Sequence, residues 1–295
     1  MKKLTSPLGI GTLVVLICAL LAGSYFVYAM YFQHEVDSVA QNGPLESQII
    51  NQDRQLPLLA EIQYAAGITY DKDNDRFFIS TDQPHTLRTI PEAYVYTLNN
   101  NLDQIEFALK LETDGDLEGI TYIGDNTVVA VSETGTLIYL QANIDITLVE
   151  QKRVAIFNDS QAHKLGSLAY DAQNQHLYTA EKEGSKTIYK LDRDGTLLDS
   201  FALQVGDTIA SNRAYSIETD YTIAGMTYAD GTLCIHSEAY STIFKLDVAT
   251  QQLTEVLGVD KLPEVAGITV KGNQFYFVGD FENYLPTPQI HVASR

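Results

Sequence analysis

The stretch AAGITYDKDNDRFFISTD, residues 65 to 82, has the pattern of a β-hairpin, with two runs of β-branched and aromatic residues separated by the turn-forming DKDND. Its apolar residues alternate with period two, unlike the three-and-four spacing of an amphipathic helix. The pattern returns four times along the chain, as EGITYIGDNTVVAVSE, LGSLAYDAQNQHLYTAE, AGMTYADGTLCIHSE and AGITVKGNQFYFVGD. The sequence therefore predicts five copies of one hairpin.

The spacing of the copies indicates the architecture. Successive hairpin glycines lie 52, 47, 59 and 42 residues apart, which is the period of β-propeller blades. Two further strand-like runs follow each of the first four hairpins, such as YVYTLN and QIEFALKL after the first, so each repeat supplies four strands. We therefore predict an all-β fold, a five-bladed β-propeller. Six blades are the alternative if residues 206 to 222 hold a degenerate blade.

The fifth repeat is short of one strand, because after QFYFVGD only QIHVAS precedes the last residue. The segment QLPLLAEI, residues 55 to 62, has strand composition and comes before the first repeat. We expect it to supply the missing outer strand of the last blade. Pairing of the two ends would close the ring and remove an exposed sheet edge.

The first residues read as a membrane segment. Leu8 to Phe32 carry no charge and are long enough to span a bilayer as one helix. Lys2 and Lys3 are expected to stay cytoplasmic, which places the rest of the chain outside the cytoplasm. We therefore expect a single-pass inner-membrane protein with its propeller in the periplasm. The alternative is a cleaved signal peptide, with Val27 and Ala29 before the cut.

Three regions follow from this interpretation: a membrane anchor at residues 1–32, a linker at 33–54 and the propeller domain at 55–295. The chain carries 38 acidic against 19 basic residues, a formal charge of -19, which argues against nucleic acid and favours cationic ligands. The two cysteines, Cys18 and Cys234, fall in different regions, so no disulfide is expected within the propeller.

The acidic turn DKDND raises the question of a calcium-binding loop. An EF-hand loop starting at Asp71 would need glycine at its sixth position and a bidentate acid at its twelfth, where Arg76 and Asp82 stand. The other repeats place ordinary turn residues at the same point, so a solvated hairpin turn is expected. The tyrosines of the first strands are expected to be core between blades: Tyr70, Tyr122, Tyr170 and Tyr228.

An acidic residue ends the second strand of every repeat, and the hairpin geometry returns this residue to the level of the repeat's glycine. Radial repetition then gathers all five acids around one mouth of the central channel. Clustered carboxylates repel until a cation binds, so calcium is expected here, whereas no grouping of Cys and His suggests zinc. The alternative is a hydrated polar rim. The predicted calcium ligands, helped by Glu118, are Asp82, Glu133, Glu181, Glu238 and Asp280.

The repeat segment LEGITYIGDNTVVAVSE, residues 117 to 133, resembles the SdiA-regulated domain family. The resemblance covers residues 55 to 295 and includes the Gly-hydrophobic-Thr/Ala-Tyr openings and the strands that end in Ser-Glu or Ala-Glu. It implies an extracytoplasmic β-propeller with an N-terminal membrane segment. The family tends to place Glu before the repeat glycine, and in this chain Glu118 alone does so.

Two classes of function are compatible with these features. The first is a non-catalytic module that binds calcium and a small-molecule or protein ligand. The second is a calcium-dependent hydrolase similar to propeller lactonases or phytases, whose base would come from the histidines near the mouth, His85, His163 and His236. No cluster of Lys and Arg suits a polyphosphate, and a lone histidine is commonly structural, so the sequence favours the binding module.

Overall fold

In the computed structural model, the structure describes residues 48–50, 52–57, 59, 61–62, 64–81, 92–113, 116–143, 145–158, 163–182, 186–203, 222–237, 241–259, 262, 265–279 and 289–295. The predicted membrane segment, residues 1–32, lies outside this part of the chain. No helix within the described residues is long and apolar enough to cross a membrane.

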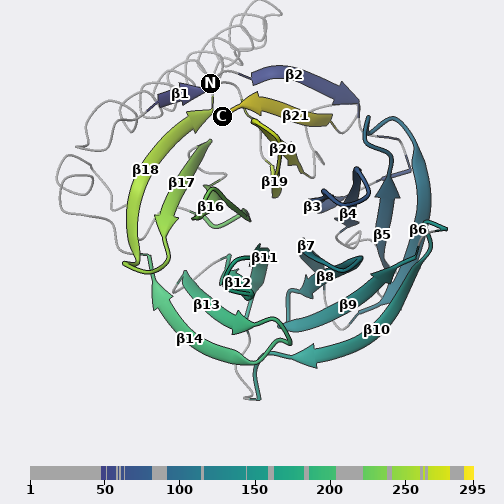
Figure 1. Cartoon of the computed structure of the whole chain (residues 1–295), viewed down its shortest axis with the longest axis horizontal. Coiled ribbons are helices and arrows are strands. Elements are labelled where there is room, and N and C mark those ends of the chain that lie inside the picture. Colours follow the sequence, from purple (N-terminus) through teal and green to yellow (C-terminus); the bar gives the residue numbers. More distant parts are fainter. Residues whose placement is uncertain are drawn as a thin grey trace, which may run out of the picture.

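The described strands form five sheets that surround one axis as the blades of a propeller (Figure 1). Blades 1 to 3 each consist of four consecutive antiparallel strands, the first nearest the axis and the fourth at the rim (Figure 1). Five blades and the predicted four strands per repeat are therefore confirmed. The strands are β3 (Ala65–Asp71), β4 (Arg76–Thr81), β5 (Glu92–Leu98) and β6 (Ile105–Glu112) in blade 1; β7 (Leu117–Gly124), β8 (Thr127–Ser132), β9 (Thr136–Ala142) and β10 (Leu148–Ala155) in blade 2; and β11 (Leu165–Asp171), β12 (His176–Glu181), β13 (Thr187–Asp192) and β14 (Leu197–Ala202) in blade 3.

Blades 4 and 5 combine strands from both ends of the chain. Blade 4 adds a short parallel strand at its outer edge, and blade 5 takes its outer strand from before the first repeat. The strands are β15 (Gly225–Ala229), β16 (Thr232–Ser237), β17 (Thr242–Asp247), β18 (Gln252–Val259) and β1 (Gln48–Ile50) in blade 4, and β19 (Gly267–Lys271), β20 (Gln274–Val278), β21 (Gln289–Ser294) and β2 (Gln52–Pro57) in blade 5.

Closure of the ring by the chain ends is confirmed, with bounds that differ from the predicted 55 to 62. Strand β2 pairs antiparallel with β21, with Leu56 opposite Ile290. It ends at Pro57, which has no N–H for a ladder, so the strand stops before the predicted segment does. Strand β1, which lies within the expected linker 33–54, places Ile49 opposite Gly258 of β18.

Neighbouring blades pack against each other through apolar side chains. One cluster joins Phe78 of blade 1 to Val128 of blade 2, and the same pattern recurs around the ring. The first-strand tyrosines lie in or against these clusters, which confirms them as core between blades: Tyr70, Tyr122, Tyr170 and Tyr228.

The DKDND segment is a hairpin turn, as predicted. The carboxylate of Asp71 is fully buried, accepts the backbone N–H groups of Asp73 and Asn74, and pairs with Arg76 at 2.9 Å. Two other carboxylates of the turn form hydrogen bonds with neighbouring blades. Asp73 accepts one from the hydroxyl of Tyr122 at 2.7 Å, and Asp75 accepts one from the Nζ of Lys271 at 2.8 Å. Protein groups thus engage all three aspartates of the turn.

The repeat glycines bring the inner strands together at the axis. A Cβ on Gly119 would lie 2.3 Å from the backbone nitrogen of Leu168, and one on Gly225 would lie 2.4 Å from the carbonyl oxygen of Ala266. A Cβ on Gly267 would lie 2.7 Å from the Cα of Gly67. Neighbouring backbones therefore occupy the places of these side chains, which explains glycine at these positions.

Candidate functional site

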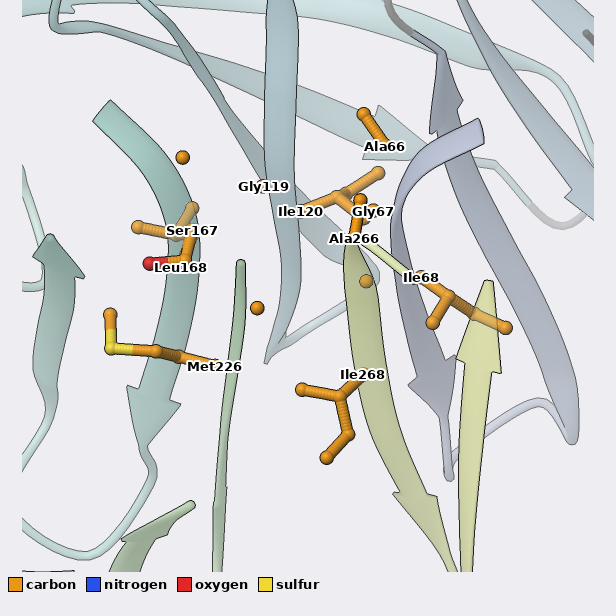
Figure 2. Close-up of a pocket in the computed structure, with 13 residues that line it drawn as sticks. Ala66, Gly67, Ile68, Gly119, Ile120, Ser167, Leu168, Met226, Ala266 and Ile268 are labelled. Carbon is orange, nitrogen blue, oxygen red and sulfur yellow. The ribbon is translucent and has the colours of Figure 1, made fainter. Parts of the chain in front are cut away.

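The space at the axis is too small for a ligand. It is lined by inner-strand residues that include Gly67, Gly119, Ser167 and Gly267, drawn in Figure 2. Its volume is about 10 Å³, at the lower limit for a single water molecule. A binding site on the axis would therefore lie at one end of the propeller rather than inside it.

One end of the axis collects the residues that the sequence singles out, and we call this end the mouth. There each inner strand begins beside the end of the second strand of its blade, as shown by the pairing of Leu117 with Ser132 and of Leu165 with Glu181. Glu133 and Glu181 therefore lie beside the start of the inner strand of their own blade. The other predicted acids of the ring lie outside the described residues: Asp82, Glu238 and Asp280.

Among the described acids of the mouth, Glu118 is the most deeply buried, with 1% of its surface exposed. Its Oε1 atom accepts a hydrogen bond from the Nζ of Lys182 in blade 3 at 2.5 Å. Its carbonyl oxygen accepts a hydrogen bond from the hydroxyl of Ser80 in blade 1 at 2.6 Å. Burial raises the pKa of the Glu118 carboxyl above its usual value, Lys182 opposes the rise, and the charges of Glu133 and Asp116 add to it. Contacts with Glu118 thus join three blades.

Glu133 and Asp116 lie beside this pair. The backbone N–H of Glu133 donates to the carbonyl of Asp116 at 2.7 Å, and Leu165 of blade 3 donates to the carbonyl of Glu133 at 2.9 Å. Both side chains are half-buried, and both act on Glu118 as like charges. The structure therefore brings together two of the predicted ligands, Glu118 and Glu133, with one acid that the sequence analysis missed.

Glu181 has protein partners of its own. Its Oε1 accepts the hydroxyl of Tyr189 at 2.8 Å and lies 3.1 Å from Nδ1 of His163. The ring of Phe157 stacks on His163 with the centroids 3.7 Å apart. Glu181 is therefore part of a half-buried cluster between blades 2 and 3, separate in its contacts from the pair of Glu118 and Lys182.

The histidines differ in their roles. His236 is fully buried, and within the described residues neither of its ring nitrogens has a hydrogen-bond partner. It meets Phe277 edge to face, and burial lowers its pKa to about 3. These features fit a core residue at the interface of blades 4 and 5 rather than a general base. His85 lies outside the described residues.

Lys182 is the other residue of the site that the sequence analysis missed. It directly follows the acid that ends the second strand of its repeat, in the sequence Glu181-Lys182. Such a basic neighbour is the one signal that could have indicated a counter-ion at the mouth. Within the described part of the chain, no group of three or more His, Cys, Asp or Glu is arranged to hold a metal ion.

Comparisons with known proteins place the chain in a family. A glutaminyl cyclase from Myxococcus xanthus, known from its crystal structure, is similar over 85% of this chain and 97% of its own, with a TM-score of 0.60 and 15% sequence identity. At this identity the likeness concerns the fold. No curated protein matches the chain. A family model described as SdiA-regulated matches residues 51–258, which is more than half of the chain, and so the chain belongs to the SdiA-regulated family.

Proposed function

We propose that this protein is a membrane-anchored, extracytoplasmic propeller that binds a cationic ligand at its mouth, with calcium as the first candidate. The observation that carries the proposal is the buried carboxylate of Glu118, with the charges of Glu133 and Asp116 close to it. Glu133 and Asp116 act on Glu118 as like charges, so a cation at the mouth would reduce the repulsion among the three carboxylates. The overall formal charge of -19 adds to the attraction of cations.

Placement outside the cytoplasm is supported by the sequence. Lys2 and Lys3 precede the uncharged stretch from Leu8 to Phe32, as in a helix whose N-terminus stays inside. Strand β1 lies at the outer edge of blade 4, so the chain enters the propeller from its rim. An anchor that joins the propeller at the rim leaves the mouth open to a ligand.

Calcium is the first candidate because carboxylate oxygens are its preferred ligands. The test is thermal unfolding of the full-length protein in detergent, with chelator and with millimolar calcium. A hundredfold excess over the dissociation constant stabilises the folded state by about 2.7 kcal/mol, which corresponds to a rise of at least about 5 °C. Glu133→Gln with Asp116→Asn should remove most of the rise. Glu150→Gln, a change in the exposed pair with Arg153 at the rim, should keep it.

Equal unfolding temperatures in chelator and in calcium would leave the mouth as a polar rim with no metal. In that case the carboxylates of the mouth would bind another cation or no cation.

An enzyme is the second candidate, a calcium-dependent hydrolase of lactone or phosphoester type. The observation that favours it is the raised pKa of Glu118, since such a carboxyl group can exchange a proton closer to neutral pH. A panel of lactones, phosphate esters and peptides with N-terminal glutamine tests the activity. The last class is included because the similar Myxococcus xanthus protein is a glutaminyl cyclase. Turnover that Glu118→Gln abolishes would support an enzyme.

A further inference from the structure

Glu118 is unusual among the residues that precede the repeat glycines. The other four positions hold apolar residues, of which Ala66, Leu165 and Ala224 are buried and Ala266 is half-buried. A carboxylate in such a place is costly unless a cation pairs with it. In this chain a primary ammonium does so, the Nζ of Lys182, which comes from a different blade and lies 64 residues further along the sequence.

Gly166 makes this contact possible. For the other four repeat glycines, a Cβ would meet backbone atoms of a neighbouring strand, but a Cβ on Gly166 would meet the side chain of Lys182. It would lie 2.1 Å from Cγ and 2.8 Å from Cδ of that lysine. The aliphatic stem of Lys182 therefore crosses the backbone of β11 at Gly166 and delivers the ammonium to Glu118.

The two members of the pair differ in their access to solvent. The side chain of Lys182 is 34% exposed, whereas that of Glu118 is 2% exposed. Lys182 thus covers the carboxylate, and its residue lies just past the end of β12 rather than within the strand. Two like charges, Glu133 and Asp116, stay near Glu118 whether or not the lysine is in place.

A buried hydroxyl next to Gly166 leaves room for a water beside the subsite. Ser167 is 1% exposed, it lines the central space in Figure 2, and within the described residues its Oγ has no hydrogen-bond partner. Buried hydroxyl groups usually have partners, so a water in the central space is expected to supply one.

We propose that Glu118, with Gly166, Glu133 and Asp116 around it, forms a subsite for a primary ammonium group, which Lys182 occupies in the free protein and vacates when a ligand binds. The ligand class is an organic amine with at least one free ammonium, such as a polyamine or a lysine side chain of a partner peptide. This inference rests on the proposed function in placing the ligand at the mouth, and it replaces the divalent ion with an amine.

Chemical rescue tests the subsite without knowledge of the natural ligand. In Lys182→Met, measured at pH 8 in the full-length protein, loss of the ammonium leaves Glu118 unpaired, and the unfolding temperature should fall by about 3 to 6 °C. Propylammonium chloride should restore most of this loss, because its ammonium can take the place of Nζ. Tetramethylammonium chloride at the same ionic strength has the charge without N–H donors and should restore little.

Matched variants separate the subsite from general effects of salt. Lys152→Met breaks an exposed ion pair with Asp194 at the rim and should respond equally to both salts. The double variant Glu118→Gln with Lys182→Met removes both charges and should not respond to propylammonium. If Lys182→Met does not fold, Gly166→Ala in the otherwise intact chain serves instead, because its Cβ displaces the stem of Lys182 and should make the protein respond to propylammonium.

Titration with spermidine then tests whether Lys182 competes with a ligand for the subsite. Spermidine should bind Lys182→Met at least about tenfold more tightly than the unaltered protein. Equal responses to propylammonium and tetramethylammonium in Lys182→Met would overturn the subsite. Calcium is titrated on the same variants: if calcium binds but amines do not rescue, the subsite is wrong and the proposed calcium site stands. Rescue by amines without any effect of calcium supports the subsite and excludes calcium as the ligand of the mouth.

Discussion

At the scale of single residues, the repeat glycines show how far a pattern can be interpreted. The sequence marks five equivalent positions, and four of them have the same cause, the contact between neighbouring backbones at the axis. The fifth, Gly166, accommodates the stem of Lys182. The glycine itself carries no sign of this difference, because the difference lies in the side chain of Lys182, which folds back from the end of the next strand.

Complete burial makes His236 a source of acid sensitivity. Its pKa is lowered to about 3 in the folded protein, against 6.5 in the unfolded chain, so only the unfolded chain takes up this proton in between. Burial also lowers the pKa of His291 on β21, to about 4. The contribution of these two histidines to the free energy of unfolding is therefore expected to be complete above pH 6.5. It should decrease as the pH falls toward 4 and then toward 3.

The contribution of His236 can be measured by chemical denaturation at pH 7 and pH 5. Between pH 7 and pH 5, one such histidine lowers the free energy of unfolding by about 2 kcal/mol. The His236→Leu variant should therefore lose about 2 kcal/mol less than the unaltered protein over the same pH range. Phe277→Leu, in the same interface but without a titrating group, should keep the original pH dependence. The same loss of stability in His236→Leu as in the unaltered protein would mean that His236 is protonated or paired in the fold.

At the scale of strands and turns, prediction from sequence was most successful where local composition decides. All four strands of the first four repeats were recognisable, and so was the turn at DKDND, because alternation and turn residues act locally. Strand β1 was missed, since three residues, Gln48–Ile50, carry too little pattern. Its existence depends on the free edge of β18, which only the assembled ring provides.

The role of the two N-terminal strands in closure predicts the effect of their removal. An internal deletion of residues 48 to 57 removes β1 and β2, exposes the edges of β18 and β21, and removes the apolar side chains of Ile50 and Leu56 from the core. The loss of these two side chains alone costs about 3 kcal/mol or more. The deleted protein should aggregate, or unfold at least about 5 °C lower.

A deletion of equal length, residues 36 to 45, is the matched control and should leave the unfolding temperature unchanged. Both proteins are compared by size-exclusion chromatography and thermal unfolding in detergent. A monomer with the original unfolding temperature after deletion of 48 to 57 would show that β2 does not stabilise blade 5.

At the scale of the whole molecule, the ring itself brings distant residues to the mouth. The propeller could be predicted from the repeat, and the strand pairing sets Glu133 and Glu181 beside the start of the inner strand of their own blade. The pairing of Glu118 with Lys182 could not be predicted, because it connects two blades through the length and rotamer of one side chain. The contacts of Glu181 with His163 and Tyr189 likewise depend on side-chain packing. The sequence repeat therefore indicates where in the fold the candidate site lies, whereas the packing of side chains determines which groups pair there.

The orientation of the whole protein is the remaining prediction. The uncharged stretch from Leu8 to Phe32 is long enough to cross a bilayer, and Lys2 and Lys3 favour a cytoplasmic N-terminus. Alkaline phosphatase fused after Arg295, which is active only outside the cytoplasm, should therefore be active, and a cytoplasmic reporter at the same place should be silent. The fusion should stay in the membrane fraction after washing with carbonate.

Moving the charge tests the physical cause of this orientation. Replacement of Lys2 and Lys3 by glutamine, with two or more lysines inserted after Phe32, removes the charge difference across the segment and should lower the phosphatase activity. The same replacement without the insertion should have a smaller effect, because fewer charges then change sides. Recovery of a soluble mature chain that begins near Met30 would contradict the anchor and support cleavage after Ala29, while leaving the propeller outside the cytoplasm.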